Sequence, residues 1–455
     1  MQFSTAFSPP FRHPGSATSM PVPTGRFALL VALTGLGFFA WPGRSWIALL
    51  VVEVVLLTVF VGDAFFGISP KQIVVFRDHP SSTALGEVTT MSWTIENHAR
   101  TSAHVTVADA LWPSLRPSRR SVEIHLAGRG RHVATAELWP SRRGRFPLDD
   151  VTVRVRTPLG FSARQRTRVV SSVLRVLPAF PSRNEMQRRM RQPRVIDSGI
   201  RSLRVKGAST DFDQLREYQP GDDSRRIDWS ATARLQKPIV RQFRAERNQT
   251  VIVLLDNGRI MAGLVDGAPR VEHAMDAALS ITHVATHLGD KVGMVSFDQQ
   301  VRTIVPASNS KAQRTRVAEA MYLLQPDLNE SAYNAAFIQA TARFRRRSLF
   351  VLLTDLVDSA VEEAILPALP ILSRRHLVVV AAVSDPDLAT WATGSTNESV
   401  SDAFRQAAAV SMLQQRRRSM ARLRAAGALV VDAPPGHLST QLVETYLDLK
   451  ASGRL

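Results

Sequence analysis

The chain of 455 residues contains no cysteine, which excludes disulfide bonds and thiolate metal sites. This composition is typical of a protein in a reducing compartment. The sequence also has no Gly-x-x-x-x-Gly-Lys-Ser/Thr phosphate loop, no His-Glu-x-x-His zinc motif and no Gly-x-Ser-x-Gly nucleophile turn. We therefore expect a protein that is not an enzyme and that has no nucleotide site of its own.

Acidic residues are few relative to basic ones: 39 Asp and Glu stand against 57 Lys and Arg, a formal net charge of +18. Such a balance favours a nucleic acid, an anionic membrane surface or an acidic protein as partner, although an arginine-rich proteome gives the same balance. The arginine runs at 345–347 and 416–418 have no nucleic-acid recognition motif beside them, and we interpret them as solvated helix faces. Nucleic acid is therefore not an expected partner.

The N-terminal region has few charged residues. Residues 1–25 are rich in Ser, Pro and Thr and predict a disordered tail. Within residues 26–67, two apolar runs near the ~20 residues of a membrane span lie on either side of Pro42 and Gly43. Because the second run follows the first at once, the pattern favours a two-helix transmembrane hairpin over a cleaved signal peptide.

Basic residues around this hairpin predict its orientation. Arg26 precedes the hairpin and Lys71 follows it, whereas the short connecting loop holds only Arg44. Positive charge gathers on the cytoplasmic side, so both ends are expected there. The sequence thus predicts a multi-pass cell-membrane protein with two helices in the bilayer and with cytoplasmic soluble domains. Glu53, inside the second run, is expensive in lipid and is interpreted as packed against the first helix.

Two further regions follow before the C-terminal half. Residues 70–178 contain short β-branched runs separated by Gly, Pro and Ser, which predict an all-β sandwich-like domain. Residues 179–249 form a basic linker followed by a charged and aromatic stretch. Residues 181–210 show no periodicity and are expected to be extended and mobile.

Residues 250–455 alternate apolar runs with longer amphipathic stretches, which predicts an α/β domain with a Rossmann-like parallel sheet. The expected strands are 251–255, 292–297, 348–354, 377–383 and 428–431. The expected helices are 270–288, 310–324, 332–346, 361–373, 402–426 and 438–449. Residues 390–401, rich in Gly, Ser and Thr, are expected to be a flexible loop.

The charged stretch carries the most specific motif, DFDQLREYQPGDDSRRIDWSATAR at residues 211–234. It resembles the signature of the domain-of-unknown-function 58 family. The matching residues are Asp211, Phe212, Leu215, Arg216, Tyr218, Gly221, Asp222, Asp223, Arg225, Asp228, Trp229, Ala233 and Arg234. Because arginine binds carboxylates bidentately and stacks on aromatic rings, we expect a semi-buried lattice of Asp222, Arg225, Asp228, Trp229 and Arg234.

The resemblance implies a von Willebrand factor type A (vWA)-like domain after the signature, and such domains bind Mg²⁺ through an Asp-x-Ser-x-Ser motif, a loop threonine and a later aspartate. Asp256 and Asp355 match the two aspartates, but the serine positions are Gly258 and Ile260. Mg²⁺ requires octahedral oxygen ligands, so we expect weak binding or none. Arg259 could take the role of the metal's charge by pairing with an aspartate, and Asn329 and Ser331 are the candidates for the missing loop ligand.

Members of that family commonly accompany MoxR-type AAA ATPases. The resemblance therefore implies a membrane-anchored, non-enzymatic protein-interaction protein whose partner is a MoxR-type ATPase, acting in assembly or maturation of other proteins. The alternative is a cell-envelope or adhesion-like vWA protein that faces outside.

Overall fold

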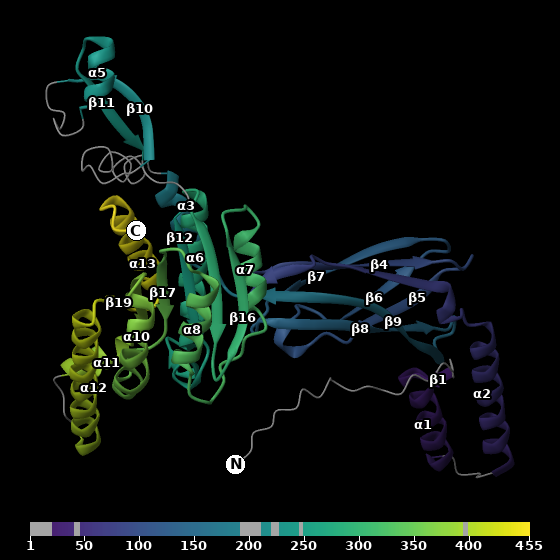
Figure 1. The fold of residues 1–455 in the computed structure, drawn as a ribbon. Helices are drawn as coiled ribbons and strands as arrows, with labels where there is room; N and C mark the ends of the chain where they lie inside the picture. The colour runs from purple at the N-terminus through teal and green to yellow at the C-terminus, as the bar shows by residue number, and fades with distance from the viewer. Residues whose placement is uncertain (1–20, 41–45, 192–210, 220–226, 245–248, 395–398) are drawn as a thin grey trace. The chain divides into compact units, whose positions relative to one another are not determined.

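The computed structural model describes residues 21–40, 46–191, 211–219, 227–244, 249–394 and 399–455 (Figure 1). The chain divides into two compact units, residues 1–177 and 178–455, and each is described by itself. Most of the expected disordered tail lies outside the described residues. Its end is ordered, because strand β1 (Pro21–Pro23) pairs with β9 (Ser162–Leu177).

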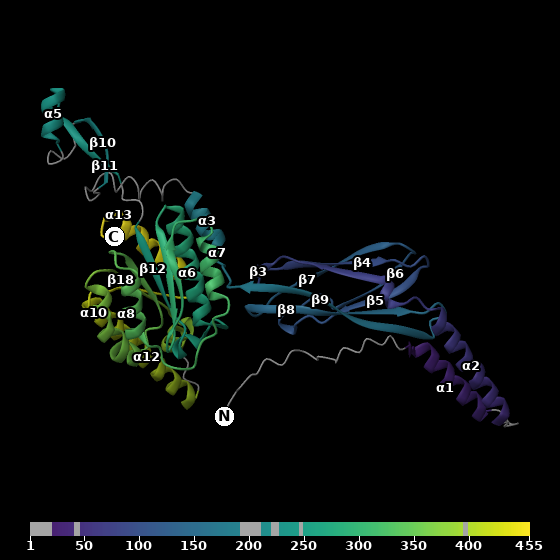
Figure 2. The same ribbon diagram turned by 45° about the vertical axis from the view of Figure 1, so that its right-hand side comes forward.

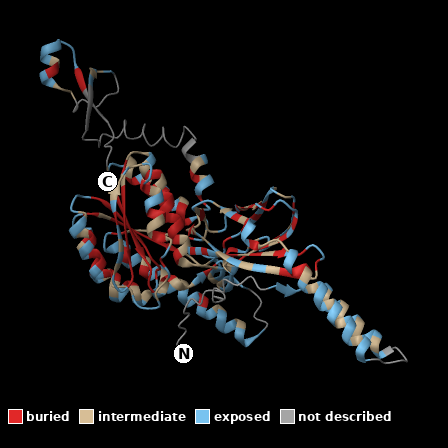
Figure 3. Ribbon diagram, turned by 90° about the vertical axis from the view of Figure 1, so that its right-hand side faces the viewer, coloured by how far each residue is buried: buried red, intermediate tan, exposed pale blue. Residues whose placement is uncertain are grey.

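The two apolar runs of the first unit form helices α1 (Gly25–Ala40) and α2 (Trp46–Phe66). Among the described residues, one helical stretch is long and apolar enough to cross a membrane: the 27 residues Trp46–Gln72, which include α2. The α1 segment is apolar but shorter. Figure 3 shows both helices mainly as exposed and intermediate residues, in contrast to the buried strands of the second unit. This exposure of apolar side chains is what a lipid-facing surface requires.

The rest of the first unit is a β-sandwich (Figure 2). Its strands are β2 (Ile73–Asp78), β3 (Ser82–Ala84), β4 (Thr89–Asn97), β5 (Ala103–Asp109), β6 (Ser121–Leu126), β7 (Arg131–Leu138), β8 (Gly144–Arg156) and β9. One sheet has the order β1-β9-β8-β5-β6 with β3 beside β9, and the other has the order β2-β4-β7. Alternate residues of both sheets point into one shared hydrophobic core, as the period of two in the sequence predicts.

The second unit is built on a six-stranded sheet. Its strands are β12 (Thr250–Asp256), β15 (Lys291–Phe297), β16 (Val301–Ser308), β17 (Leu349–Leu353), β18 (Leu377–Val383) and β19 (Leu429–Ala433), in the order β16-β15-β12-β17-β18-β19. Five strands are parallel, as predicted, but β16 is antiparallel to β15 and was not predicted. The β12 and β17 strands are buried over nearly their whole length.

Helices cover both faces of this sheet. They are α6 (Arg270–His287), α7 (Gln313–Met321), α8 (Tyr333–Arg343), α9 (Asp358–Ala360), α10 (Leu366–Ser373), α11 (Pro386–Thr393), α12 (Val400–Ala425) and α13 (Leu438–Ala451). A π-helical turn, Val361–Ile365, joins α9 to α10. One core cluster joins α8, α10 and α12 to the sheet, whereas α6 packs against α13.

Two predictions of irregular structure were wrong in part. The expected loop 390–401 overlaps the end of α11 and the start of α12, while residues 395–398 lie outside the described chain. The expected extended linker begins as helix α3 (Arg183–Arg191). The Ser182 hydroxyl donates a hydrogen bond of 2.5 Å to Asp276 on α6, and Met186 is 1% exposed. These contacts explain why this part of the linker is helical; residues 192–210 are not described.

The signature region folds as an antiparallel pair, β10 (Asp211–Glu217) and β11 (Ile239–Arg244), with helix α5 (Trp229–Leu235) between them. Asp228 begins α5, because its carboxylate accepts hydrogen bonds from the backbone N–H groups of Ser230 and Ala231, both at 3.0 Å.

Candidate functional site

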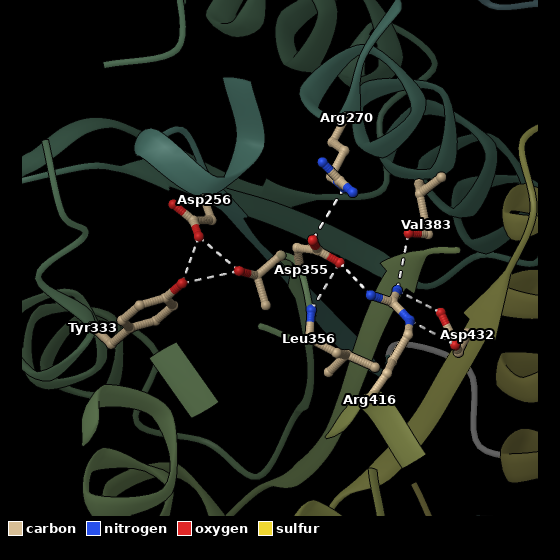
Figure 4. Close-up of polar contacts among 9 residues, drawn as sticks. Asp256, Arg270, Tyr333, Asp355, Leu356, Val383, Arg416 and Asp432 are labelled. Atoms are coloured by element: carbon tan, nitrogen blue, oxygen red, sulfur yellow. Dashed lines mark hydrogen bonds and ion pairs between the residues drawn. The ribbon is translucent and has the colours of Figure 1, made fainter. Parts of the chain in front are cut away.

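The candidate site lies where the parallel strands of the second unit end, which is where open α/β sheets bind ligands (Figure 4). Asp256 is the last residue of β12, and Thr354 and Asp355 follow β17 directly. Asp432 lies near the end of β19, which is separated from β17 by β18 along the same edge. Asp256, Thr354 and Asp355 are at most 2% exposed, so their polar groups need partners inside the protein.

Asp256 finds its partners among hydroxyl groups. Its Oδ2 accepts hydrogen bonds from the Tyr333 phenol at 2.6 Å and from the Thr354 hydroxyl at 2.6 Å. Its Oδ1 accepts from the Ser331 hydroxyl at 2.5 Å and from the Gly258 backbone N–H at 2.9 Å. The carboxylate is therefore held by donors from three segments at the sheet edge: the loop after β12, the start of α8 with the residues just before it, and the loop after β17.

The position of the Ser331 side chain requires a glycine at residue 258. A Cβ built on Gly258 would lie 2.0 Å from the Ser331 Oγ and 3.3 Å from the Asp256 Oδ1. A serine at position 258, as in the Asp-x-Ser-x-Ser motif, is thus incompatible with the observed place of Ser331. The hydroxyl that contacts Asp256 comes from residue 331 instead, so Ser331, predicted as a candidate loop ligand for a metal, here donates a hydrogen bond to the Asp256 carboxylate.

Burial shapes the protonation chemistry of this group. Burial raises the pKa of Asp256, and the hydrogen bonds from Ser331, Thr354 and Tyr333 oppose that rise only in part. Burial beside the Asp256 carboxylate raises the pKa of the Tyr333 phenol well above its ordinary value. Tyr333 therefore stays a protonated hydrogen-bond donor rather than a base.

Asp355 is bound by two guanidinium groups. The Arg416 Nη1 donates to its Oδ1 at 2.7 Å, and the Arg270 Nε lies 3.0 Å from its Oδ2. Arg416 also makes a two-pronged contact with Asp432, at 2.7 and 3.0 Å. The guanidinium is largely buried, which by itself lowers the pKa, but its ion pairs with Asp432 and Asp355 prevail and raise the pKa of Arg416 above its ordinary value.

Space for Arg270 is provided by Gly263. A Cβ on Gly263 would lie 2.1 Å from the Arg270 Nη1, so a larger residue there would displace the guanidinium. The result is a chain of alternating charges, Arg270–Asp355–Arg416–Asp432, across the ends of β17 and β19 (Figure 4). Bidentate pairing of this kind is the strong form of a protein ion pair.

These residues do not fit a Mg²⁺ ion. The metal requires several hard oxygen ligands, yet Gly258 supplies no side-chain oxygen and Asp355 is already bound by two cations. The prediction that Arg259 takes the metal's charge role was wrong, because Arg259 pairs with Glu330 at 3.1 Å on the surface. Arg270 and Arg416 neutralise Asp355 instead. The interpretation of residues 416–418 as a solvated helix face was therefore wrong for Arg416, whose side chain is only 12% exposed.

The signature residues are only partly described. Gly221, Asp222, Asp223 and Arg225 lie outside the described residues, so the predicted lattice is not visible there. Trp229 is 72% exposed, which is not the semi-buried position predicted for it. Ala233 and Arg234 are also exposed on α5, and Leu215 is 42% exposed on β10. Arg216 and Tyr218 are half-buried, whereas for Asp211 and Phe212 only the backbone of β10 is described.

Residues 214–422 match the family model described as "Protein of unknown function DUF58". The match starts in β10 and ends within α12, so it includes the described end of the signature and both Asp256 and Asp355. It agrees with the resemblance carried by residues 211–234.

Curated relatives are similar to part of the chain. An uncharacterized protein of Mycobacterium bovis is 29% identical over 184 residues, which cover 40% of this chain and 57% of the relative. An uncharacterized protein of Mycobacterium tuberculosis matches with the same identity and the same coverage. The chain thus spans little more than half the length of these relatives.

Two solved structures are similar in part. BatB from Bacteroides thetaiotaomicron aligns with 45% of this chain and 99% of its own, at 16% identity and a TM-score of 0.32. The vWF domain of the type V pili tip protein Mfa5 from Porphyromonas gingivalis aligns with 24% of this chain and 38% of its own, at 14% identity and a TM-score of 0.20.

Proposed function

We propose that this chain is a membrane-anchored, non-enzymatic protein whose vWA-like second unit binds another protein. The observation that carries this proposal is a set of large apolar side chains exposed on α11 and α12. Phe404 is 73% exposed, Val400 is 75% exposed, and Trp391 and Met412 are 42% and 51% exposed. Apolar side chains gathered on a surface in this way are typical of protein-binding sites.

The sheet edge supports a binding role over a catalytic one. The Asp256 carboxylate accepts four hydrogen bonds, and Asp355 is bound by Arg270 and Arg416. A catalytic carboxylate needs a free lone pair directed at a substrate, and these two are engaged within the protein. We infer that the charge chain fixes the loops of this edge and that partner binding proceeds without Mg²⁺.

The anchor of the proposal is a transmembrane hairpin of α1 and α2. The two helices contact each other, and the Thr34 hydroxyl donates a hydrogen bond of 3.1 Å to the Glu53 carboxylate across them. This contact supports the interpretation of Glu53 as a residue packed against the first helix. The basic residues Arg26 and Lys71 at the outer ends of the hairpin favour a cytoplasmic position for both soluble parts.

For the partner we propose a MoxR-type AAA ATPase, with a role in assembling or maturing other proteins. Support comes from the resemblance to the domain-of-unknown-function 58 family. Since the sequence has no phosphate loop, ATP would be bound and hydrolysed by the partner.

The test is a binding measurement between the full-length chain in mild detergent and a purified MoxR-type ATPase from the same organism, by biolayer interferometry. Phe404→Asp should weaken binding by about thirtyfold, as expected for an interface anchor. Ile338→Asp, at a side chain 53% exposed on α8, is the matched control and should leave affinity unchanged. Binding should persist in a chelator without nucleotide.

Two results would oppose the proposal. If the wild-type chain does not bind the ATPase at micromolar concentration, the partner is wrong. If Ile338→Asp weakens binding as much as Phe404→Asp, the exposed apolar residues of α11 and α12 are not the interface.

A further inference from the structure

An open pocket of about 760 Å³ lies in the first unit where α2 ends. Its walls come from two stretches of chain, one within residues 66–72 and one at residues 98–101. The residues that decide its chemistry are Phe66, Ile68, Lys71, His98, Arg100 and Thr101. The pocket thus combines apolar side chains from the end of α2 with cationic side chains from the β-sandwich.

The pocket is suited to an anion. Lys71 and Arg100 line it, neither forms an ion pair with a described residue, and no Asp or Glu is found among its described lining residues. The Glu96 carboxylate pairs with the pocket-lining His98, with its oxygen 3.5 Å from the His98 Nε2. We therefore assign anion binding to Lys71 and Arg100, with the Thr101 hydroxyl as a neutral donor. His98 is not assigned to the anion, because it contacts Glu96.

The wall that carries Arg100 is rigid. Asn97, which is 2% exposed, donates hydrogen bonds to the carbonyls of Thr101 at 2.9 Å and Ala127 at 3.0 Å. Gly128 permits a close backbone approach, since a Cβ there would lie 1.9 Å from the Arg100 carbonyl oxygen. The loop is therefore formed before any ligand binds, which lowers the entropy lost on binding.

The wall that carries Lys71 is fixed as well. The Arg168 Nη2 donates to the carbonyls of Pro70 at 2.9 Å and Lys71 at 2.8 Å. The His98 backbone N–H donates to the Gln72 carbonyl at 2.8 Å, which joins this wall to the other. Both cationic side chains thus project from a frame whose backbone positions are held by hydrogen bonds.

The position of the pocket along α2 identifies its ligand. With 21 residues, α2 has a length of ~31 Å, which equals the thickness of the hydrocarbon layer of a bilayer. Phe65 and Phe66, at its end, are both 79% exposed, so the end of the helix presents apolar rings on its surface. If α2 crosses the membrane, as the proposed function requires, the residues that follow it lie at the depth of the lipid headgroups.

We propose that this pocket binds the phosphate of an anionic phospholipid headgroup between Lys71 and Arg100, with the lipid tail beside Phe65 and Phe66. The inference rests on the membrane anchoring in the proposed function. The ligand of the pocket is a lipid of the bilayer that α2 crosses. Binding this lipid gives the first unit a contact with the bilayer in addition to the helices themselves.

The experiment uses the full-length chain in a neutral detergent and measures binding of dioctanoyl phosphatidylglycerol by native mass spectrometry. The double variant Lys71→Gln/Arg100→Gln should bind about thirtyfold more weakly, which corresponds to ~1 kcal/mol for each basic residue removed. The control is Arg120→Gln/Arg145→Gln. Arg120 and Arg145 are both exposed. Each lies at the end of its ladder, β5–β6 or β8–β9, that is farther from the pocket, so neither substitution should affect binding.

Two further ligands identify the source of the anion. Dioctanoyl phosphatidylcholine, which has no net charge, should bind weakly, and inorganic phosphate should bind weakly because it lacks the apolar part. Inorganic phosphate bound as tightly as the lipid would overturn the lipid assignment. Equal losses in the pocket variant and the control variant would overturn the pocket, because attraction would then come from the general positive surface.

The two proposals fail separately. One outcome is that the chain stays in the membrane pellet while the double variant Lys71→Gln/Arg100→Gln binds phosphatidylglycerol as tightly as wild type. That result would refute the lipid site in the pocket and leave the membrane anchor supported. A full-length chain released by alkaline carbonate would overturn the anchor, and with it the bilayer as the source of the ligand.

Discussion

Arg416 is the residue on which the charge chain of the sheet edge depends most. Substituting Met keeps the apolar stem and leaves Asp355 and Asp432 without their shared cation. Breaking a buried pair by removing one partner costs ~3–5 kcal/mol, so we expect Arg416→Met to lower the free energy of unfolding in urea by that amount.

The control for this variant stands two residues away. Arg418 lies on the exposed side of the same helix, and Arg418→Met should change stability by less than ~0.5 kcal/mol. Equal stability of the two variants would show that Arg270 alone suffices for Asp355.

The contact between Gly258 and Ser331 predicts a coupled pair of substitutions. Gly258→Ser alone should destabilise the protein by ~1–3 kcal/mol, because the new Cβ meets the Ser331 hydroxyl at 2.0 Å. Combined with Ser331→Ala, the same change should be much milder. Thermal denaturation of the four proteins of this cycle gives the coupling energy, and additive effects would mean that the loop moves aside freely.

Asp256 predicts a dependence of stability on pH. Its pKa is raised in the folded protein, so the folded state holds the proton more tightly than the unfolded state does. The contribution of Asp256 to stability therefore falls as the pH rises from ~4 through the folded-state pKa. The free energy of unfolding of Asp256→Asn, relative to that of wild type, should therefore rise as the pH increases through that window. At pH values above the window the difference between the two proteins should be constant. Urea titrations at a series of pH values measure this difference, and a flat difference throughout would contradict the raised pKa.

The two aspartates of the site were predictable because each follows an uninterrupted apolar run, and such runs end at one edge of a parallel sheet. The role of Arg416 was not predictable, because Arg416 stands in a run of three arginines and its partner Asp355 is 61 residues away. A signal was nevertheless present. Ala409, Arg416 and Leu423 are spaced by seven residues, so Arg416 shares a helix face with two buried residues.

Among the elements, the parallel strands were predictable and β16 was not. Parallel strands buried on both faces are almost wholly apolar, and this makes them visible in the sequence. β16 is an edge strand with mainly exposed or intermediate residues and with Pro306 inside it, a pattern that also fits a loop. The helical start of the linker was missed because its stability comes from contacts with α6 rather than from its own periodicity.

The junction of α2 with the β-sandwich depends on Asp63. Its buried carboxylate accepts hydrogen bonds from the Thr157 hydroxyl and from the backbone N–H groups of Leu159, Phe161 and Ser162. We expect Asp63→Ala to speed amide hydrogen exchange at residues 159, 161 and 162 strongly, while exchange in the core strand β4 stays unchanged. Asp149→Ala, at an exposed position of β8, is the control and should leave these amides protected.

For the whole molecule, the apolar N-terminal helices predict an association with the membrane. Full-length protein should remain in the membrane pellet after extraction with alkaline carbonate, because the 27-residue stretch Trp46–Gln72 is long and apolar enough to cross a bilayer. Deleting residues 27–66 should release the rest as soluble material. Recovery of the intact chain in the supernatant would contradict membrane spanning, and reporter fusions at the C-terminus would decide its orientation.

The long strand β9 has a mechanical consequence. It begins beside the turn that binds Asp63 and ends at Leu177, the last residue before the second unit. A pulling force on the second unit would therefore act along the axis of β9. Since β9 pairs with β8 over nearly its whole length, all those hydrogen bonds would be loaded together in shear instead of breaking one after another. With the membrane anchor and the partner that we propose, the first unit would act as a stiff tether that transmits force from the partner to the bilayer.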